Sequence, residues 1–471
     1  MNLATYLTHP IFATIRKVAA QSHIETYVVG GFVRDLMLKR TGKDIDFVCV
    51  GSGIELAEKT AAAIHPKIKV SVFRNFGTAH FATDGWDFEF VGARKESYQR
   101  ESRNPIVESG TLTDDQNRRD FTINAMAISL NDSDFGELVD PFGGLDDIAS
   151  EVIRTPLDPD ITFSDDPLRM MRAIRFASQL NFYIDDETLE AIARNKERIK
   201  IISQERITDE LNKIILSKKP SVGFRLLEET GLLQLIFPEM QQLKGVQTVD
   251  DKSHKDNFYH TLQVLDNICF TTNDLWLRWA AILHDIAKPV TKRYENGVGW
   301  TFHGHEVVGS KWVPRIFRHF KLPLGNEMKL VQKLVYLHLR PIALSKEEIT
   351  DSALRRLLFE AGDDIESLMK LCEADITSKN KVKVSRFLKN FEIVRQKLKD
   401  VEERDSIRNF QPPVSGEMIM QTFGIGPSRE VGVIKDRLKE AILEGEIRND
   451  FEEAHALMLK MGAELGLKKL G

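Results

Sequence analysis

The chain has 471 residues, too many for one hydrophobic core, and at about 100–200 residues per domain its length predicts three or four domains. Its 65 Lys and Arg residues against 70 Asp and Glu residues give a net charge of -5, which excludes a global basic field, so any RNA-binding surface must be local. No apolar run reaches the roughly 18–20 residues that span a bilayer, and three scattered cysteines, Cys49, Cys269 and Cys372, suggest no disulfide framework. We therefore expect a cytoplasmic protein without a membrane partner.

The N-terminal part of the chain predicts an α/β domain. Residues 1–21 lack the pattern of a signal peptide and space their apolar residues as an amphipathic helix does. Short apolar runs then predict strands at 26–29, 46–50, 69–73, 80–83 and 87–91, and helical patterns predict helices at 32–39 and 54–64. The polar stretch from Arg94 to Gln116 is expected to be a mobile loop over the site.

A glycine turn and two aspartates carry the first chemical signal. Gly30 and Gly31 lie between a predicted strand and a predicted helix, whose free N-terminal amides can hold a triphosphate. Asp44 and Asp46 stand two residues apart on the next strand, so their carboxylates project from the same face and can share divalent cations. Two-metal nucleotidyl transfer requires this arrangement.

With Arg34 three residues beyond the glycines, this tandem resembles the signature of the polymerase-β-like nucleotidyltransferases, in the branch of CCA-adding enzymes and poly(A) polymerases. The resemblance implies that Asp44 and Asp46 hold Mg²⁺, and that the glycines and Arg34 hold the nucleotide's phosphates. A third carboxylate often comes from a neighbouring strand. Glu89 or Asp87 can supply it, and a strand with one solvated acidic face is the alternative.

The segment from Arg118 to Ala127 matches the family's RRDFTxNAxx motif. This resemblance implies that Arg119 and Asp120 contact the ribose of the incoming nucleotide and shape its site. A planar guanidinium suits that task because it offers several donors to phosphate or hydroxyl oxygens at once.

The next motif begins at Asp165. Asp166 is a good N-cap and Pro167 a good first helical residue, and an ion pair between Asp166 and Arg169 is expected at i,i+3 spacing. The segment resembles the EDxxR motif of class II CCA-adding enzymes, although Asp165 replaces the usual Glu. The resemblance implies that Asp166 and Arg169 act as a protein template for C and A, and that Arg172 and Arg175 also contact the nucleotide.

From about residue 146 strand signals vanish, and histidines and aspartates recur along a helical region in the order H, HD, H, H, D. Imidazole and carboxylate groups bind transition metals that activate water. The order resembles that of the HD phosphohydrolases, and it implies a metal site for ions such as Mn²⁺, Ni²⁺ or Co²⁺. A phosphatase or 2′,3′-cyclic phosphodiesterase activity and a purely structural domain are the alternatives. The implied ligands are a basic set of His260, His284, Asp285 and Asp375, with His305 and His338 for a second metal.

These patterns predict an α/β nucleotidyltransferase head over 1-145, a helical neck that binds RNA and nucleotide over 146-240, an all-α HD domain over 255-395 and a helical tail over 411-471. In the tail, the turn Gly424–Pro427 can meet a phosphate or serve ordinary packing. The resemblance implies addition of CCA to tRNA from CTP and ATP. The region from Phe76 to Phe81 lacks the basic signature of poly(A) polymerases. A poly(A) polymerase, a split-activity CC- or A-adding enzyme and an inactive RNA-binding module are the alternatives, and no oligomeric state is predicted.

Overall fold

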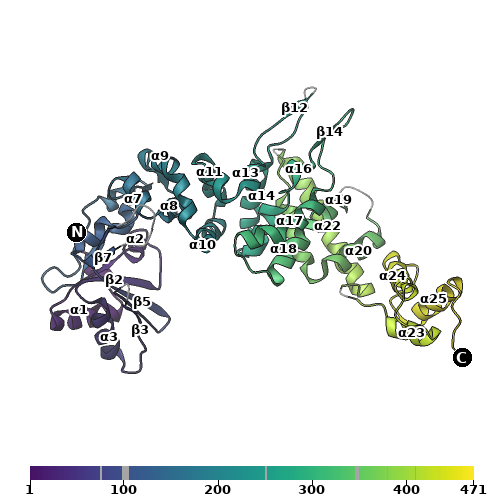
Figure 1. The fold of residues 1–471 in the computed structure, drawn as a ribbon, viewed down its shortest axis with the longest axis horizontal. Coiled ribbons are helices and arrows are strands. Elements are labelled where there is room, and N and C mark those ends of the chain that lie inside the picture. Colours follow the sequence, from purple (N-terminus) through teal and green to yellow (C-terminus); the bar gives the residue numbers. More distant parts are fainter. Residues whose placement is uncertain are drawn as a thin grey trace. The chain divides into compact units, whose positions relative to one another are not determined.

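A computed structural model describes residues 1–74, 77–97, 106–249, 252–344, 349–378, 380–408 and 410–470. The chain forms two compact units, Met1–Pro238 and Glu239–Gly471, which run from purple to teal and from teal to yellow in Figure 1. Among the described helices, none combines the length and apolarity needed to cross a membrane. The division falls close to the expected end of the neck at 240, and the finer four-domain division stays a prediction.

A seven-stranded sheet organises the first part of unit 1, in the order β3-β4-β5-β2-β1-β8-β9. Strands β2 and β5 are parallel, and the other neighbours in the sheet are antiparallel. Helices α1 (Pro10–Ser22) and α3 (Gly53–Ile64) pack on the sheet, where Phe12, Phe47, Phe88 and Phe90 form an aromatic core. The strands are β1 Glu25–Val29, β2 Asp44–Val50, β3 Ser71–Phe73, β4 Thr78–Thr83, β5 Trp86–Gly92, β8 Ala127–Ser129 and β9 Leu138–Val139.

All five predicted strands form, each within two residues of its expected bounds, as does the predicted helix at 54–64. The N-terminal helix begins only at Pro10, because Ala4–Tyr6 forms a separate 3-10 turn, η1. The prediction of a loop from Arg94 to Gln116 was partly wrong. Strands β6 (Arg94–Ser97) and β7 (Ile106–Ser109) pair as a hairpin and α4 (Leu112–Asn117) follows, while 98–105 lie outside the described residues.

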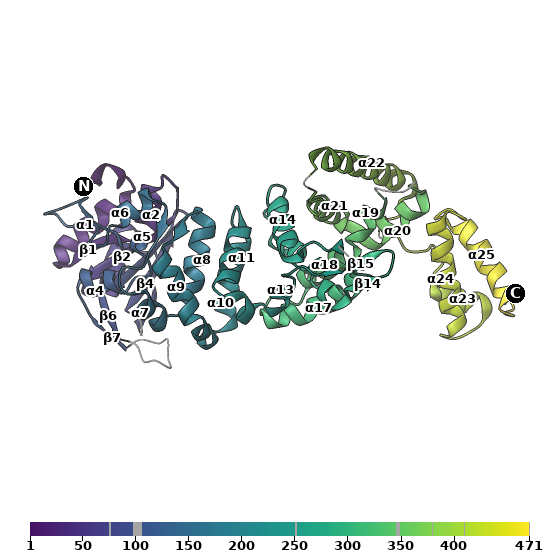
Figure 2. The same ribbon diagram turned by 90° about the horizontal axis from the view of Figure 1, so that it is seen from above.

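Helices build most of the rest of unit 1, as Figure 2 shows. Its second half packs α8 against both α10 and α11. The helices of this part are α5 Thr122–Ala125, α6 Gly144–Ala149, α7 Pro159–Asp165, α8 Leu168–Leu180, α9 Asp186–Asn195, η3 Lys196–Ile201, α10 Gln204–Ile215, α11 Pro220–Glu229 and α12 Leu232–Ile236, with α13 Pro238–Gln241 at the division between the units.

The expectation that strands vanish after residue 146 was wrong. Three short pairs occur among the described residues beyond this point, and strands of two or three residues are too short to show a period in sequence. The pairs are β10 Val152–Ile153 with β11 Tyr183–Ile184, β12 Thr248–Val249 with β13 Lys252–Ser253, and β14 Arg293–Glu295 with β15 Gly299–Thr301.

Unit 2 is otherwise helical. Its last three helices have a hydrophobic core of their own, which includes Val414, Ile419, Ile434, Leu438 and Met458. The helices are α14 Asn257–Cys269, α15 Leu275–Leu283, α16 Lys288–Thr291, α17 His305–His319, α18 Asn326–Leu337, α19 Leu339–Leu344, α20 Asp351–Ala361, η4 Gly362–Asp364, α21 Ile365–Ala374, α22 Lys381–Asp405, α23 Gly416–Phe423, α24 Arg429–Glu444 and α25 Phe451–Glu464.

Candidate active site and metal centre

Four carboxylates lie side by side on one face of the sheet. Asp44 and Asp46 alternate along β2 with the buried Ile45. The parallel register places Asp44 beside Asp87 and Asp46 beside Glu89 on β5. Because side chains of paired residues in a sheet share a face, the two strands together present two rows of two acidic groups.

The negative charge of this cluster changes the pKa of Asp46. Burial, then the negative charges of Glu89 and Asp44, raise the pKa of Asp46 to about 6 against the opposing charge of Arg119. Such mutual repulsion among acidic groups is relieved by a divalent cation, so the residues present fit Mg²⁺. Oδ1 of Asp87 lies 3.0 Å from Nε2 of His80. Glu89 is therefore the better third carboxylate, because it acts directly on Asp46.

Gly30 brings the backbone against this cluster. Its φ of +71° lies in the left-handed region, and a Cβ there would stand 3.3 Å from Oδ2 of Asp46 and 3.2 Å from Nη1 of Arg119. Gly31 begins helix α2 (Gly31–Met37), one residue earlier than expected. The turn therefore places the first helical residues beside the carboxylates.

Asp120 organises the side chains of the second motif. Its Oδ2 accepts hydrogen bonds from Nε and Nη2 of Arg172 at 2.7 and 2.6 Å, and its Oδ1 accepts one from Asn124 at 3.0 Å. Burial would raise the pKa of Asp120, but Arg172 and Asn124 lower it to about 2. The amide oxygen of Asn124 in turn accepts from Nη1 of Arg34 at 2.9 Å. Asp120 thus fixes two guanidinium groups, one of them through Asn124.

Two other carboxylates form ion pairs with Arg119 and Arg175, which also belong to this site. Nη2 of Arg119 lies 2.9 Å from Oδ2 of the buried Asp115, and Nε of Arg175 lies 3.1 Å from Oε2 of the buried Glu210. Arg34, Arg119, Arg172 and Arg175 line one cavity of about 1140 Å³ together with Asp44, Asp46 and Glu89. The cavity therefore joins a carboxylate cluster to a set of positioned guanidinium groups that can hold a polyphosphate.

A second cavity, of about 400 Å³, contains Asp166 and Arg169. Helix α8 begins one residue later than expected, with Pro167 as N-cap, and Oδ1 of Asp166 accepts a hydrogen bond from the backbone N–H of Leu168 at 3.2 Å. The backbone N–H of Arg169 donates to the backbone carbonyl of Asp166 at 3.0 Å, but no side-chain hydrogen bond or ion pair joins the two residues within the described part of the chain. Arg169 instead donates to the backbone carbonyl of Arg118 at 2.5 Å, because it is buried beside that loop.

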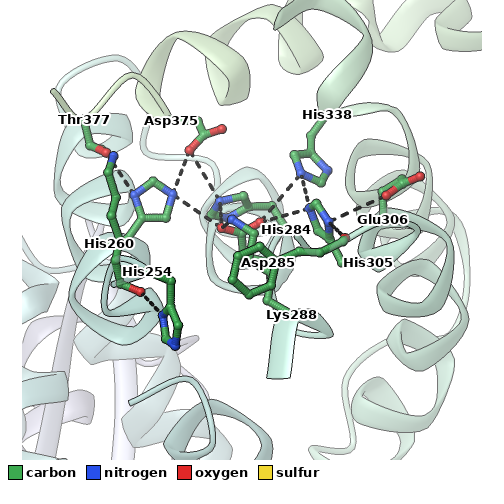
Figure 3. A network of polar contacts seen from close by, with 12 residues as sticks. His254, His260, His284, Asp285, Lys288, His305, Glu306, His338, Asp375 and Thr377 are labelled. Atoms are coloured by element: carbon green, nitrogen blue, oxygen red, sulfur yellow. Dashed lines mark hydrogen bonds and ion pairs between the residues drawn. The ribbon is translucent and has the colours of Figure 1, made fainter. Parts of the chain in front are cut away.

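In unit 2 the six residues of the HD pattern meet in one centre, which Figure 3 shows with Asp285 in the middle. Four of them are buried, and His260 and Asp375 are half-buried. On one side, Oδ2 of Asp285 lies 3.4 Å from Nε2 of His260 and 3.2 Å from Nε2 of His284. On the other side, its Oδ1 lies 3.2 Å from Nε2 of His305 and 3.8 Å from Nε2 of His338. One carboxylate thus connects two ligand sets.

Asp375, just past the end of α21, joins the first of these sets. Its Oδ1 lies 2.9 Å from Nε2 of His260 and 3.6 Å from Nε2 of His284. Five of the six residues, all but Asp375, appear in two triplets whose ligand atoms lie within 4.8 Å of one another.

The other ring nitrogen of each histidine is tied to a neighbouring oxygen atom. Nδ1 of His284, His305 and His338 each lies 2.7 Å from a backbone carbonyl, and Nδ1 of His260 lies 2.9 Å from the hydroxyl of Thr377. An N–H donated to those carbonyls leaves Nε2 as the atom with a free lone pair. The four imidazoles therefore turn their metal-binding nitrogen towards the centre.

The electrostatics of the centre also fit a cation. Burial would lower the pKa of His284, but Asp285 and Asp375 raise it to about 10, while burial and His284 lower the pKa of His338 to about 4. Nε2 of His284 is fully buried and close to two carboxylates without hydrogen-bond geometry to any described group. A divalent ion would satisfy that nitrogen and balance the carboxylates.

Sequence reasoning missed several residues of both sites. Asp115 stands three and four residues before Arg118 and Arg119, so helical spacing was a usable signal. Lys288, whose Nζ lies 2.6 Å from Oδ2 of Asp285, offered the same i,i+3 signal. No local signal links Glu210 to Arg175, which stands 35 residues earlier in the chain.

A sheet with paired carboxylates beside a glycine turn and an arginine-lined cavity defines a nucleotidyltransferase head. Three families match the sequence: "Poly A polymerase head domain" over residues 26–154, "Probable RNA and SrmB- binding site of polymerase A" over 181–243, and "HD domain" over 257–380.

Curated relatives extend this similarity. The A-adding tRNA nucleotidyltransferase of Deinococcus radiodurans is 31% identical over 75% of this chain and 80% of that protein, and the multifunctional CCA protein of Hahella chejuensis is 32% identical over 75% and 82%. The A-adding tRNA nucleotidyltransferase of Aquifex aeolicus is 33% identical over 68% of this chain, which spans only 38% of that protein. The chain belongs to this family of tRNA nucleotidyltransferases.

Solved structures show the same fold. The CCA-adding enzyme of Bacillus stearothermophilus in complex with CTP aligns with a TM-score of 0.69 and 24% identity over 98% of this chain and 99% of that one. The Thermotoga maritima CCA-adding enzyme complexed with tRNA aligns with a TM-score of 0.60 and 22% identity over 97% and 95%. A polymerase head followed by helical and HD domains is thus the architecture of this chain.

Proposed function

We propose that this protein is a CTP(ATP):tRNA nucleotidyltransferase, which adds C, C and A to tRNA 3′ ends without a nucleic-acid template. The observation that carries the proposal is the single cavity shared by Asp44, Asp46, Glu89 and the positioned arginines. Relatives named for A-adding and CCA activities, together with similar enzymes solved in complex with CTP, with ATP and with tRNA, support the substrates tRNA, CTP and ATP. A cytoplasmic location is part of the proposal.

Asp44, Asp46 and Glu89 would hold Mg²⁺. When bound, the metal supplies Lewis-acid activation of the primer 3′-hydroxyl and charge stabilisation of the pyrophosphate. The chain's own groups orient the nucleotide: the Gly30 and Gly31 turn lets its phosphates approach closely, and the guanidinium groups of the cavity hold them.

Asp166 and Arg169 would read the base edge in the smaller cavity, with Arg172 between the two cavities because it lines both. Asp120 acts in this proposal by positioning Arg172, since its two oxygen atoms already accept hydrogen bonds from protein groups. Arg119 and Arg175 would contact the nucleotide from the wall of the larger cavity.

The HD centre would hold two divalent transition-metal ions such as Mn²⁺, Ni²⁺ or Co²⁺, with Asp285 contributing one oxygen atom to each set. Bound ions of this kind supply an activated water for phosphate-ester hydrolysis. The four imidazole rings, whose Nδ1 atoms contact neighbouring oxygen atoms, support this second, phosphohydrolase activity.

A second candidate for the transfer reaction is A addition alone, because the relatives from Aquifex aeolicus and Deinococcus radiodurans carry that name. The two candidates share the carboxylate cluster and differ in the sequence of the product. None of the relatives and solved structures named above is a poly(A) polymerase or an inactive RNA-binding module, so neither alternative is favoured.

Asp46→Asn tests the transfer site. The amide keeps the shape of the side chain but removes the charge that would hold Mg²⁺, so nucleotide incorporation into tRNA should fall to a few per cent of wild type or less at saturating Mg²⁺. Asp132→Asn is the matched control, because Asp132 is exposed and lies outside the cavity wall. Substantial incorporation by Asp46→Asn would show that the cluster is not the catalytic metal site.

A further inference from the structure

The carboxylate cavity continues past Asp44 to a wall that the proposed function leaves unused. Thr8, Thr41 and Gly42 belong to this wall, and we call its five aromatic, imidazole and cationic residues the rim: Tyr6, His9, Arg40, Lys43 and Trp86. Two of them precede residue 26, where the match to the polymerase head domain begins.

Specific contacts place the rim at the start of the catalytic strands. The carbonyl of Lys43 accepts a hydrogen bond from the backbone N–H of Asp87 at 2.9 Å, which fixes the end of the 38–43 loop beside β5. Trp86 is the first residue of β5, and its ring centroid lies 4.5 Å from that of His9. His9 is itself held as the N-cap of α1, where Nδ1 accepts from the N–H of Ile11 at 3.1 Å.

The positive charges of the rim lack carboxylate partners, unlike the arginines that line the other side of the cavity. Arg40 and Lys43 are exposed, and in the described parts of the chain neither has a carboxylate partner. Arg34, Arg119 and Arg172, by contrast, all contact carboxylates. Unpaired cations that line a cavity together with an exposed aromatic ring, that of Tyr6 with 58% exposure, and a half-buried one, that of Trp86, form the kind of surface that single-stranded nucleic acids bind through phosphate contacts and base stacking.

The position of the rim along β2 indicates which substrate it can bind. Lys43 directly precedes Asp44 and stands three residues before Asp46. Asp46 lies against Gly30 and Arg119. At about 3.3 Å per strand residue, the rim begins roughly 10 Å from Asp46 along β2. In phosphoryl transfer the attacking and leaving oxygens lie in line on opposite sides of the phosphorus. If the triphosphate binds to the arginines of the cavity, the RNA strand that carries the attacking hydroxyl must therefore approach from the side of the rim.

We propose that the rim binds the unpaired 3′ end of the RNA primer, with Arg40 and Lys43 contacting backbone phosphates and Tyr6 and Trp86 stacking on bases. His9 positions the ring of Trp86. This proposal rests on the proposed function, because it assigns the attacking substrate of the same site.

The charge contribution is tested with the double variant Arg40→Ala, Lys43→Ala in the full chain. The control, Lys17→Ala with Lys67→Ala, also removes two exposed cations, but from outside the cavity wall. The dissociation constant of tRNA lacking its 3′ CCA is measured over a series of salt concentrations. Each lost phosphate contact lowers the slope of log K against log salt by about 0.7, so the rim variant should lose about 1.4 and the control nothing. The KM for CTP should stay unchanged in both.

The stacking contribution is tested at the exposed Tyr6 and at Trp86. Tyr6→Ala and Trp86→Ala should each weaken binding of the same tRNA by roughly 5- to 150-fold, the range for loss of one base–aromatic stack, while Trp86→Phe should retain most of the affinity. Wild-type affinity and salt slope in all rim variants would overturn the proposal. If wild type binds the tRNA through the rim but incorporates no nucleotide, the proposed function fails and the rim assignment stands.

Discussion

Gly30 provides a sharp test of the site's geometry, because the neighbouring Gly31 serves as its control. Alanine at position 30 would occupy a backbone conformation with φ +71° and ψ -135°, which costs about 1–3 kcal/mol for a residue with a Cβ. The added Cβ would also lie 3.3 Å from Oδ2 of Asp46 and 3.2 Å from Nη1 of Arg119. Gly30→Ala should therefore destabilise the head and displace the carboxylate of Asp46.

Gly31→Ala has neither problem. Its φ is not positive, and the closest atom to an added Cβ is Nη2 of Arg34 at 3.7 Å, an ordinary contact. Because Gly31 begins a helix, alanine there should be neutral or stabilising by about 0.4–1 kcal/mol. Hydrogen exchange of β1 and β2 peptides should thus separate the two variants by roughly 1–4 kcal/mol. Incorporation should fall more steeply in Gly30→Ala than in Gly31→Ala, and equal protection and activity in the two variants would refute this geometry.

Three further predictions concern the base site, the HD centre and acid stability. Arg169→Ala should raise misincorporation of the wrong base about tenfold, since an unmade buried hydrogen bond costs about 1–3 kcal/mol, and unchanged CTP and ATP selectivity would remove the template assignment. The double change His284→Ala, Asp285→Ala should abolish bound transition metal and phosphate-ester hydrolysis yet spare nucleotide incorporation; metal content equal to wild type would contradict the ligand set. Asp120 has a folded pKa of about 2, below its usual value, so it should contribute about 2 kcal/mol of stability that is present above pH 4 and lost as pH falls towards 2. Acid unfolding of Asp120→Asn should lack that pH dependence, and a titration identical to wild type would show that the Arg172 pair contributes nothing.

Local patterns predicted the elements that carry the chemistry. The apolar runs around the glycine turn located β1 and β2, and the i, i+2 spacing placed Asp44 and Asp46 on one face. These features depend only on strand periodicity, which a single sequence contains.

Features that depend on long-range pairing could not be predicted. The parallel register that sets Glu89 beside Asp46 joins residues 43 positions apart, so sequence alone left both Glu89 and Asp87 as candidates. In the same way, the expected pair of Asp166 and Arg169 gave way to a contact between Arg169 and the carbonyl of Arg118, 51 residues away. Tertiary contacts therefore decided which partner each charged side chain uses.

The most direct test of the central claim is to sequence the 3′ ends formed when the purified full chain acts on tRNA lacking CCA, with CTP, ATP and Mg²⁺. The account predicts that the products end in C, C and A and stop there, and that a variant combining Asp44→Ala with Asp46→Ala yields no extension. Products extended by A alone, by two C residues alone or by a long run of A would contradict it, as would CCA addition by the double variant.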